Sequence, residues 1–172
     1  IALLVHHPGA FTTSTVGAWI ARIGRAYGEL MRRTAGYATV SCLENTVGAG
    51  STLVSGFEQP AVLRGAIIGA AGCPQRVGFC LDTCHAHAGG NALETVVEDV
   101  LKVTGRIDLV HCNDSRDEFD SGADRHANFG AGKIEPELLA AVVRDAQAPV
   151  VCETPGGADQ HVADFQWLSE RL

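Results

Sequence analysis

The sequence lacks several features that would place it in common protein classes. No apolar run approaches the roughly 20 residues that a membrane helix needs. The chain also does not open with the charged-then-apolar segment of a secretory signal. Only 19% of the residues are charged and 46% are hydrophobic, which excludes an intrinsically disordered chain. We therefore expect one globular domain over residues 1–172, with no membrane partner.

The six cysteines include no Cys-x-x-Cys pair. Most lie within or next to apolar runs, which favours buried, reduced thiols over a disulfide scaffold or a Cys-type zinc site. Reduced thiols predict a cytoplasmic location. The cysteines in question are Cys42, Cys80, Cys84, Cys112 and Cys152.

The Gly-x-Gly-x-x-Gly motif of dinucleotide-binding sheets is also absent after the first apolar run. Five short apolar runs alternate instead with stretches of helical periodicity, a pattern that predicts an α/β fold with a parallel sheet covered by helices. A doubly wound sheet and a TIM (β/α)8 barrel both satisfy it. The predicted strands are 1–5, 38–43, 77–81, 107–110 and 149–152, and the predicted helices are 16–34, 60–71, 92–103, 135–146 and 162–172.

Five β/α units amount to five-eighths of a TIM barrel. The chain opens directly on Ile-Ala-Leu-Leu-Val, which has the composition of a core strand. We therefore expect the first strands of the barrel to lie upstream of Ile1.

Every predicted strand is followed by a histidine or a carboxylate. In a parallel barrel the strand ends gather on the face where active sites are built. A polar residue at any single strand end is ordinary, but five in five drawn from His, Asp and Glu indicate metal ligands. These residues are His7 (beside His6), Glu44, Asp82 (with His85), His111 and Glu153.

A further cluster, Asp124-Arg125-His126, lies in the loop after the fourth strand. Alternate residues of an extended segment share a face, so Asp124 and His126 can point the same way. Imidazole and carboxylate without thiolate suit zinc or manganese in a catalytic role. Eight such groups exceed the needs of one ion, which predicts two or more metals.

Four motifs together resemble the signatures of the endonuclease IV family, the zinc-dependent apurinic/apyrimidinic endonucleases. The resemblance runs in order through nearly the whole chain. The motifs are Glu44-Asn45-Thr46-x-Gly48-x-Gly50, Gly78-Phe79-Cys80-Leu81-Asp82-Thr83-Cys84-His85, His111-Cys112-Asn113-Asp114-Ser115, and Asp124-Arg125-His126-Ala127-Asn128-x-Gly130-x-Gly132.

The resemblance implies a TIM barrel that holds three zinc ions, with manganese possible in one position. It implies that His7 binds the first zinc and that Glu44 bridges the first and second. The remaining ligands of the second zinc would then be Asp82, His111 and Glu153, and those of the third His85, Asp124 and His126.

The family's ninth ligand and its early DNA-reading loops have no counterpart in the sequence. Residues Phe11–Thr15 also depart from the family pattern, which puts the local DNA contact in doubt but not the His7 ligand.

The family's activity is hydrolysis of the phosphodiester 5′ to an abasic site in double-stranded DNA, which leaves a 3′-hydroxyl, and removal of 3′ blocking groups. The resemblance assigns catalytic roles to Glu44, which holds the attacking water, and to Glu153, which orients or deprotonates it. We expect a monomer that acts at the bacterial nucleoid. The net charge of −7 opposes DNA binding, but bound zinc would make the pocket locally positive.

Four further residues have expected supporting roles. Asn113 and Asp114 are expected to orient ligands through hydrogen bonds, and Arg116 and Arg125 to contact phosphates.

Two other functions remain open. A xylose-isomerase-like sugar isomerase or epimerase also uses Glu, Asp, His and Glu at strand ends, but with one or two metals. Such an enzyme would not need the third cluster, formed by His85, Asp124 and His126. A non-catalytic, truncated zinc- or DNA-binding relative is favoured by the missing ninth ligand and opposed by the eight that are present.

Overall fold

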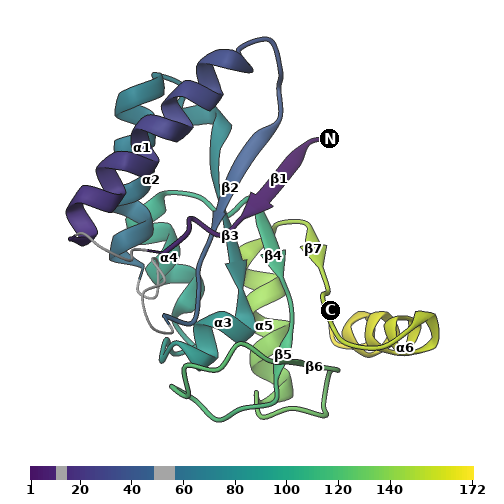
Figure 1. Cartoon of the computed structure of the whole chain (residues 1–172). Coiled ribbons are helices and arrows are strands. Elements are labelled where there is room, and N and C mark those ends of the chain that lie inside the picture. The colour runs from purple at the N-terminus through teal and green to yellow at the C-terminus, as the bar shows by residue number, and fades with distance from the viewer. Residues whose placement is uncertain (11–14, 49–56) are drawn as a thin grey trace.

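A computed structural model describes residues 1–10, 15–48 and 57–172 of the chain. Its centre is a parallel sheet in the order β1-β2-β3-β4-β7 (Figure 1). The predicted parallel sheet is therefore confirmed, and its neighbouring strands follow one another in chain order. The strands are β1 (Leu3–His6), β2 (Val40–Glu44), β3 (Val77–Asp82), β4 (Leu109–His111) and β7 (Val150–Val151).

Helices α1, α2, α4 and α5 lie along one side of this sheet, and α6 stands away from them (Figure 1). No helix among the described residues is long and apolar enough to cross a membrane. The helices are α1 (Val16–Arg33), α2 (Glu58–Ala71), α3 (Thr83–Ala88), α4 (Val96–Thr104), α5 (Pro136–Ala146) and α6 (Ala158–Ser169), with a 3-10 turn η1 (Pro74–Arg76).

The helix-facing side of the sheet carries the main hydrophobic core. Leu43, Phe79 and Val110 point from neighbouring strands into this core, where they meet Leu63 of α2 and Leu139 of α5. Each of these side chains is at most 1% exposed, so the apolar surface of the strands is removed from water by the helices.

The opposite face of the sheet carries a smaller apolar cluster that leads into polar strand ends. Side chains two residues apart share a face of a strand. Each buried member of the small cluster is therefore followed, on the same face, by a predicted metal ligand. The three pairs are Cys42 and Glu44, Cys80 and Asp82, and Leu109 and His111.

The structure corrects two helix boundaries. The third predicted helix, 92–103, begins only at Val96, because residues 93–95 form a turn. The last predicted helix, 162–172, runs instead from Ala158 to Ser169. Gly50 of the Glu44 motif and residues 11–14 of the departing segment lie outside the described residues.

Besides the short turn η1, the sequence did not predict α3, which follows β3 directly, or an antiparallel hairpin. The hairpin pairs β5 (Asp114–Ser115) with β6 (His126–Ala127) and places His126 beside the ends of the parallel strands.

Candidate metal centre

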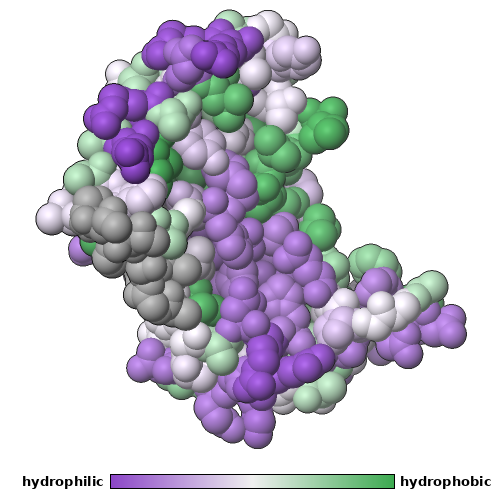
Figure 2. Space-filling view, viewed as in Figure 1, coloured by the Kyte–Doolittle hydropathy of each residue, from purple (hydrophilic) through white to green (hydrophobic). Residues whose placement is uncertain are grey.

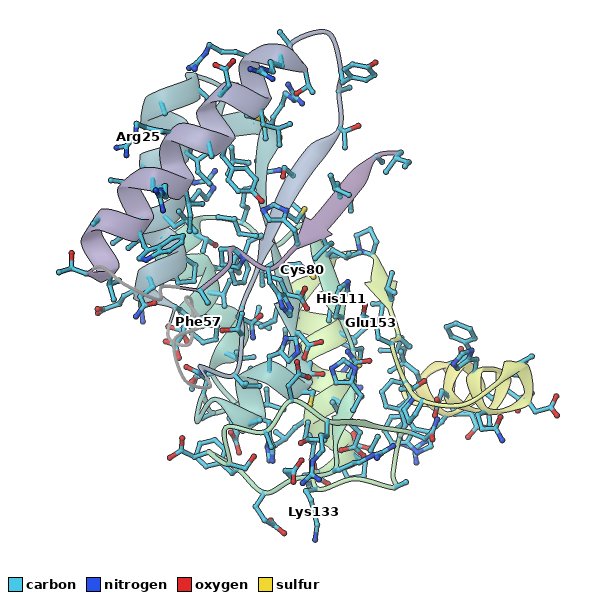
Figure 3. All side chains as sticks on the ribbon, viewed as in Figure 1. Arg25, Phe57, Cys80, His111, Lys133 and Glu153 are labelled. Carbon is cyan, nitrogen blue, oxygen red and sulfur yellow. The ribbon has the colours of Figure 1, made fainter. Side chains whose placement is uncertain are left out.

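Four of the predicted ligands meet at the carboxyl end of the sheet. Glu44, Asp82, His111 and Glu153 each offer one ligand atom, and these atoms all lie within 4.8 Å of one another. Nδ1 of His111 is 2.9 Å from Oε1 of Glu44 and 3.2 Å from Oε2 of Glu153. Figure 3 shows His111 and Glu153 together at the strand ends, next to Cys80. This group corresponds to the predicted second metal position.

A second group forms where α3 and the hairpin approach each other. Oδ1 of Asp124 is 3.1 Å from Nε2 of His85 and 3.5 Å from Nε2 of His126. The two imidazole rings lie 5.5 Å apart. His85 and His126 also share a possible metal position with Asp82. The chain thus brings together the three residues predicted for the third metal.

His7 approaches the same centre from the end of β1. Its Nε2 lies 3.2 Å from Oε2 of Glu44, and the two residues form a third possible metal position with His85. Glu44 therefore lies between His7 and His111, as a bridging carboxylate must. His6 lies elsewhere and stacks on Tyr27 of α1, as expected for the neighbour of an inward-facing residue.

The electrostatics of these groups reflect burial among opposite charges. Burial opposes ionisation of Glu44, yet hydrogen bonds from His111 and His7 prevail and lower its pKa to about 2. Burial likewise disfavours the charged rings of His85 and His111. Hydrogen bonds to Asp124 raise the pKa of His85 to about 9, and hydrogen bonds involving Cys80, Glu153 and Glu44 raise that of His111 to about 12.

Asp82 is a fully buried carboxylate at the site. Burial raises the pKa of its carboxyl group. A metal ion beside it would favour the ionised form.

The hydrogen bonds of two histidines leave ring nitrogens available for a metal. Nδ1 of His126 lies 3.2 Å from the carbonyl oxygen of Glu153, and Nδ1 of His85 lies 3.0 Å from that of Asn45. When each ring is neutral and its Nδ1 donates its proton there, each Nε2 has a lone pair that a metal ion can accept, and in His85 that ion would replace the hydrogen bond to Asp124. Nε2 of His126 is buried and has no hydrogen-bond partner among the described residues. This orphaned nitrogen and the imidazole–carboxylate donor set fit zinc.

Two amides fix the position of Asp82. The Asn113 side chain donates to Oδ2 of Asp82 at 2.7 Å and accepts from the backbone N–H of Glu153 at 2.7 Å, which matches its expected orienting role. The Asn45 side chain accepts from the backbone N–H of Asp82 at 2.8 Å and donates to its carbonyl at 3.0 Å. Asn45 belongs to the Glu44 motif, but its role is not evident from the sequence alone.

Cys80 is a second residue that the sequence reasoning missed. Its apolar surroundings predict only a buried hydrophobic group, but its sulfur lies within 4.8 Å of ligand atoms of Glu44 and His111. Its position two residues before Asp82 on the same strand face was the available signal.

The remaining predicted residues lie further from the centre. Arg125 forms an ion pair with Asp117, and Arg116 is exposed, so their contacts with phosphate stay predictions. Asp114 accepts hydrogen bonds from backbone N–H groups and thereby holds the glycine-containing loop instead of a ligand side chain. The donors are Ser115, Gly130, Gly132 and Ile134.

The outer surface is polar where these groups gather. Figure 2 shows hydrophilic residues across the middle of the view, over the strand ends and the hairpin, with hydrophobic residues beside them near β1. The side chains of His7, Asp124 and Glu153 are each nearly half exposed, whereas those of Glu44 and His85 are buried. The site therefore has a buried floor and an accessible rim.

A half-barrel of parallel strands with ligands at its carboxyl end defines a class of protein. Residues 1–171 match the family of xylose isomerase-like TIM barrels, and the chain belongs to that family. The predicted TIM-barrel fold is confirmed.

Within this class, the chain resembles endonucleases. It is 52% identical over 130 residues to "Probable endonuclease 4" of Mycobacterium bovis, a match that covers 75% of this chain and 48% of that protein. A Mycobacterium leprae protein of the same name is 54% identical over 112 residues, 65% of this chain and 42% of the relative. The chain thus spans about half the length of the curated relatives it matches.

Solved structures agree with this likeness. Endonuclease IV from Thermus thermophilus superposes with a TM-score of 0.79 at 27% identity, over 99% of this chain and 62% of that one. A D-tagatose 3-epimerase-like protein reaches the same TM-score at 19% identity, over 99% of this chain and 61% of that one, which shows the shared fold alone. The resemblance to endonuclease IV is confirmed.

Proposed function

We propose that this chain carries the metal centre of a zinc-dependent DNA-repair endonuclease. Its substrate is double-stranded DNA with an abasic site, which it cuts 5′ to the lesion to leave a 3′-hydroxyl, and it also removes 3′ blocking groups. The observation that carries this proposal is the cluster of His85, Asp124 and His126 beside the four-residue group of Glu44. A sugar isomerase needs only the latter group. The names of the relatives support an endonuclease.

Three zinc ions, with manganese possible in one position, fit the donors described above. His7 and Glu44 would hold the first, Glu44 with Asp82, His111 and Glu153 the second, and His85, Asp124 and His126 the third. Zinc in such a set supplies Lewis acidity that neutralises phosphate charge and activates water.

The protein's own groups have distinct tasks in this reaction. Glu153, whose side chain is 46% exposed, can reach an entering phosphodiester and accept the proton of the attacking water. Glu44, whose side chain is 6% exposed, is held between the imidazoles of His7 and His111 and would position the metal ions from the buried side of the site. We propose that the protein acts as a monomer in the bacterial cytoplasm.

Elemental analysis combined with an incision assay tests the proposal. We expect about three zinc ions per chain and incision 5′ to a tetrahydrofuran abasic-site analogue in duplex DNA, abolished by EDTA. His126→Ala should lose zinc and lower the incision rate by about 10²-fold or more, whereas Lys102→Ala, exposed on α4 away from the site, should do neither.

Three outcomes decide among the functions. Chelator-sensitive incision supports the endonuclease. Fewer metals, no incision and isomerisation of a ketose would identify a sugar isomerase or epimerase. Zinc binding with neither activity would identify a non-catalytic relative.

A further inference from the structure

Helix α6 contains a buried carboxylate that the reaction described above does not use. The helix stands away from the other helices (Figure 1), and its buried residues are Asp164 and Leu168. Asp164 is only 4% exposed. Burying a carboxylate destabilises the fold unless hydrogen bonds satisfy its oxygens. The hydrogen-bond partners of Asp164 therefore indicate its role.

The partners of Asp164 come from two loops. Its Oδ2 accepts hydrogen bonds from the Asn128 side chain at 2.8 Å and from the Thr154 hydroxyl at 2.5 Å. Its Oδ1 accepts from the backbone N–H of Phe129 at 3.0 Å. The Asn128 side chain also donates to the carbonyl of Pro155 at 2.9 Å, which ties the two loops to each other. One carboxylate thus joins the segment after β6 to the segment after β7.

Both segments carry candidate metal ligands. His126 lies two residues before Asn128, and Glu153 directly precedes Thr154. The two ligands also touch, since Nδ1 of His126 lies 3.2 Å from the carbonyl oxygen of Glu153. We infer that Asp164 is a positioning residue that holds His126 and Glu153 at one separation and so sets the zinc affinity of the centre. This inference rests on the proposed zinc site.

A purely structural role would be to dock α6. Other contacts already serve that purpose: Leu168 is buried in the core, and Trp167 stacks on Phe129 with ring centroids 5.0 Å apart. These apolar contacts form no hydrogen bond to the ligand-bearing backbone. Docking and positioning can therefore be separated by substitution.

The test compares three variants by chelator competition for zinc and by thermal unfolding. Asp164→Asn keeps the side-chain shape but turns an acceptor into a donor that faces the Asn128 amide. We expect its zinc affinity to fall about 10–100-fold. Asp159→Asn makes the same charge change on the exposed side of α6 and should bind zinc like the wild type. Leu168→Ala should lower Tm but leave the zinc affinity of the folded protein unchanged.

A milder variant keeps the test informative if Asp164→Asn does not fold. Thr154→Val removes one hydrogen bond to Asp164 while keeping a similar side-chain shape, and it should weaken zinc binding in the same direction. An Asp164→Asn protein that loses stability but binds zinc as tightly as the wild type would overturn the inference. Failure of zinc-loaded wild type to cut DNA would overturn the endonuclease proposal alone, because zinc affinity is measured without DNA.

Discussion

Buried residues at the centre shift their pKa in opposite directions, and each shift acts in its own pH range. His85 and His111, with pKa values of about 9 and about 12, hold protons that the unfolded chain releases near 6.5. Their contribution to the free energy of unfolding is complete below pH 6.5 and is lost as the pH rises through these values. Glu44 contributes above its unfolded value of 4.5, and this contribution is lost as the pH falls through about 2.

We therefore predict that the Tm of the metal-free protein falls as the pH is raised from about 6.5 to 9. Zinc competes with protons for the same nitrogens, so zinc binding near pH 7 should release protons. Thermal unfolding across this range, and calorimetry in buffers of different ionisation enthalpy, measure the two effects. A metal-free Tm that rises over this range, or zinc binding without proton release, would contradict the assignment.

Single residues also show where sequence reasoning reached its limit. The eight ligand candidates are visible in the sequence because each depends on a local feature. Most follow a predicted strand, Asp124 and His126 are two residues apart, and His85 lies three residues after Asp82. Asp164 could not be found this way, because an acidic residue on a helix reads as solvent-exposed until distant loops are known to cover it. Asn45 and Cys80 were visible in motifs, but their roles depend on the register between β2, β3 and β4.

Helices α1 and α2 pack closely against each other through small residues. A Cβ atom on Gly24 or Gly28 of α1 would lie 3.0 Å or 2.6 Å from the Cβ atom of Ala66 or Ala70 of α2. These two glycines allow the helices to approach. The hydrophobic periodicity that predicted both helices could not reveal this contact, because it shows which face is buried but not what it meets.

We predict that Gly28→Val lowers the free energy of unfolding by about 1–3 kcal/mol, because the added methyl groups overlap with Ala70 and force the helices apart. Gly69→Ala on α2 is the matched control, since nothing lies within 4 Å of its added Cβ. It should raise stability by about 0.5–1 kcal/mol through helix propensity. Denaturant unfolding measures both changes, and a shift of the same sign in the two variants would rule out this account of the packing.

Helix α3 and the β5–β6 hairpin, which the sequence did not predict, lie next to the site. Helix α3 begins where β3 ends because Asp82 caps it, accepting a hydrogen bond from the backbone N–H of His85 at 2.7 Å. The β5–β6 hairpin has only two residues in each strand, too few for a periodic pattern. Long apolar elements are predictable from sequence, whereas these short ones depend on contacts made after the sheet has formed.

The proposed ligands are distributed over all five strands of the parallel sheet. They follow or end every strand from β1, through His7, to β7, through Glu153. Metal ions held by these residues would link the strands directly and would bind the folded chain in preference to the unfolded one.

We predict that removal of zinc by EDTA lowers the Tm and that added zinc restores it. A free zinc concentration about 100-fold above Kd corresponds to about 2.7 kcal/mol of stabilisation. Differential scanning calorimetry measures the shift, and magnesium, which prefers oxygen ligands, serves as the control ion. An unchanged Tm after complete zinc removal would show that the metal does not link the strands.

The distribution of these ligands along the chain also fixes the order of events during biosynthesis. His7 leaves the ribosome well before Glu153, from which most of the described sequence separates it. Chains are made from the N-terminus at a limited rate, so a nascent chain presents incomplete donor sets until Glu153 has emerged. Capture of zinc by the full set therefore cannot precede the emergence of β7 and the segment that follows it.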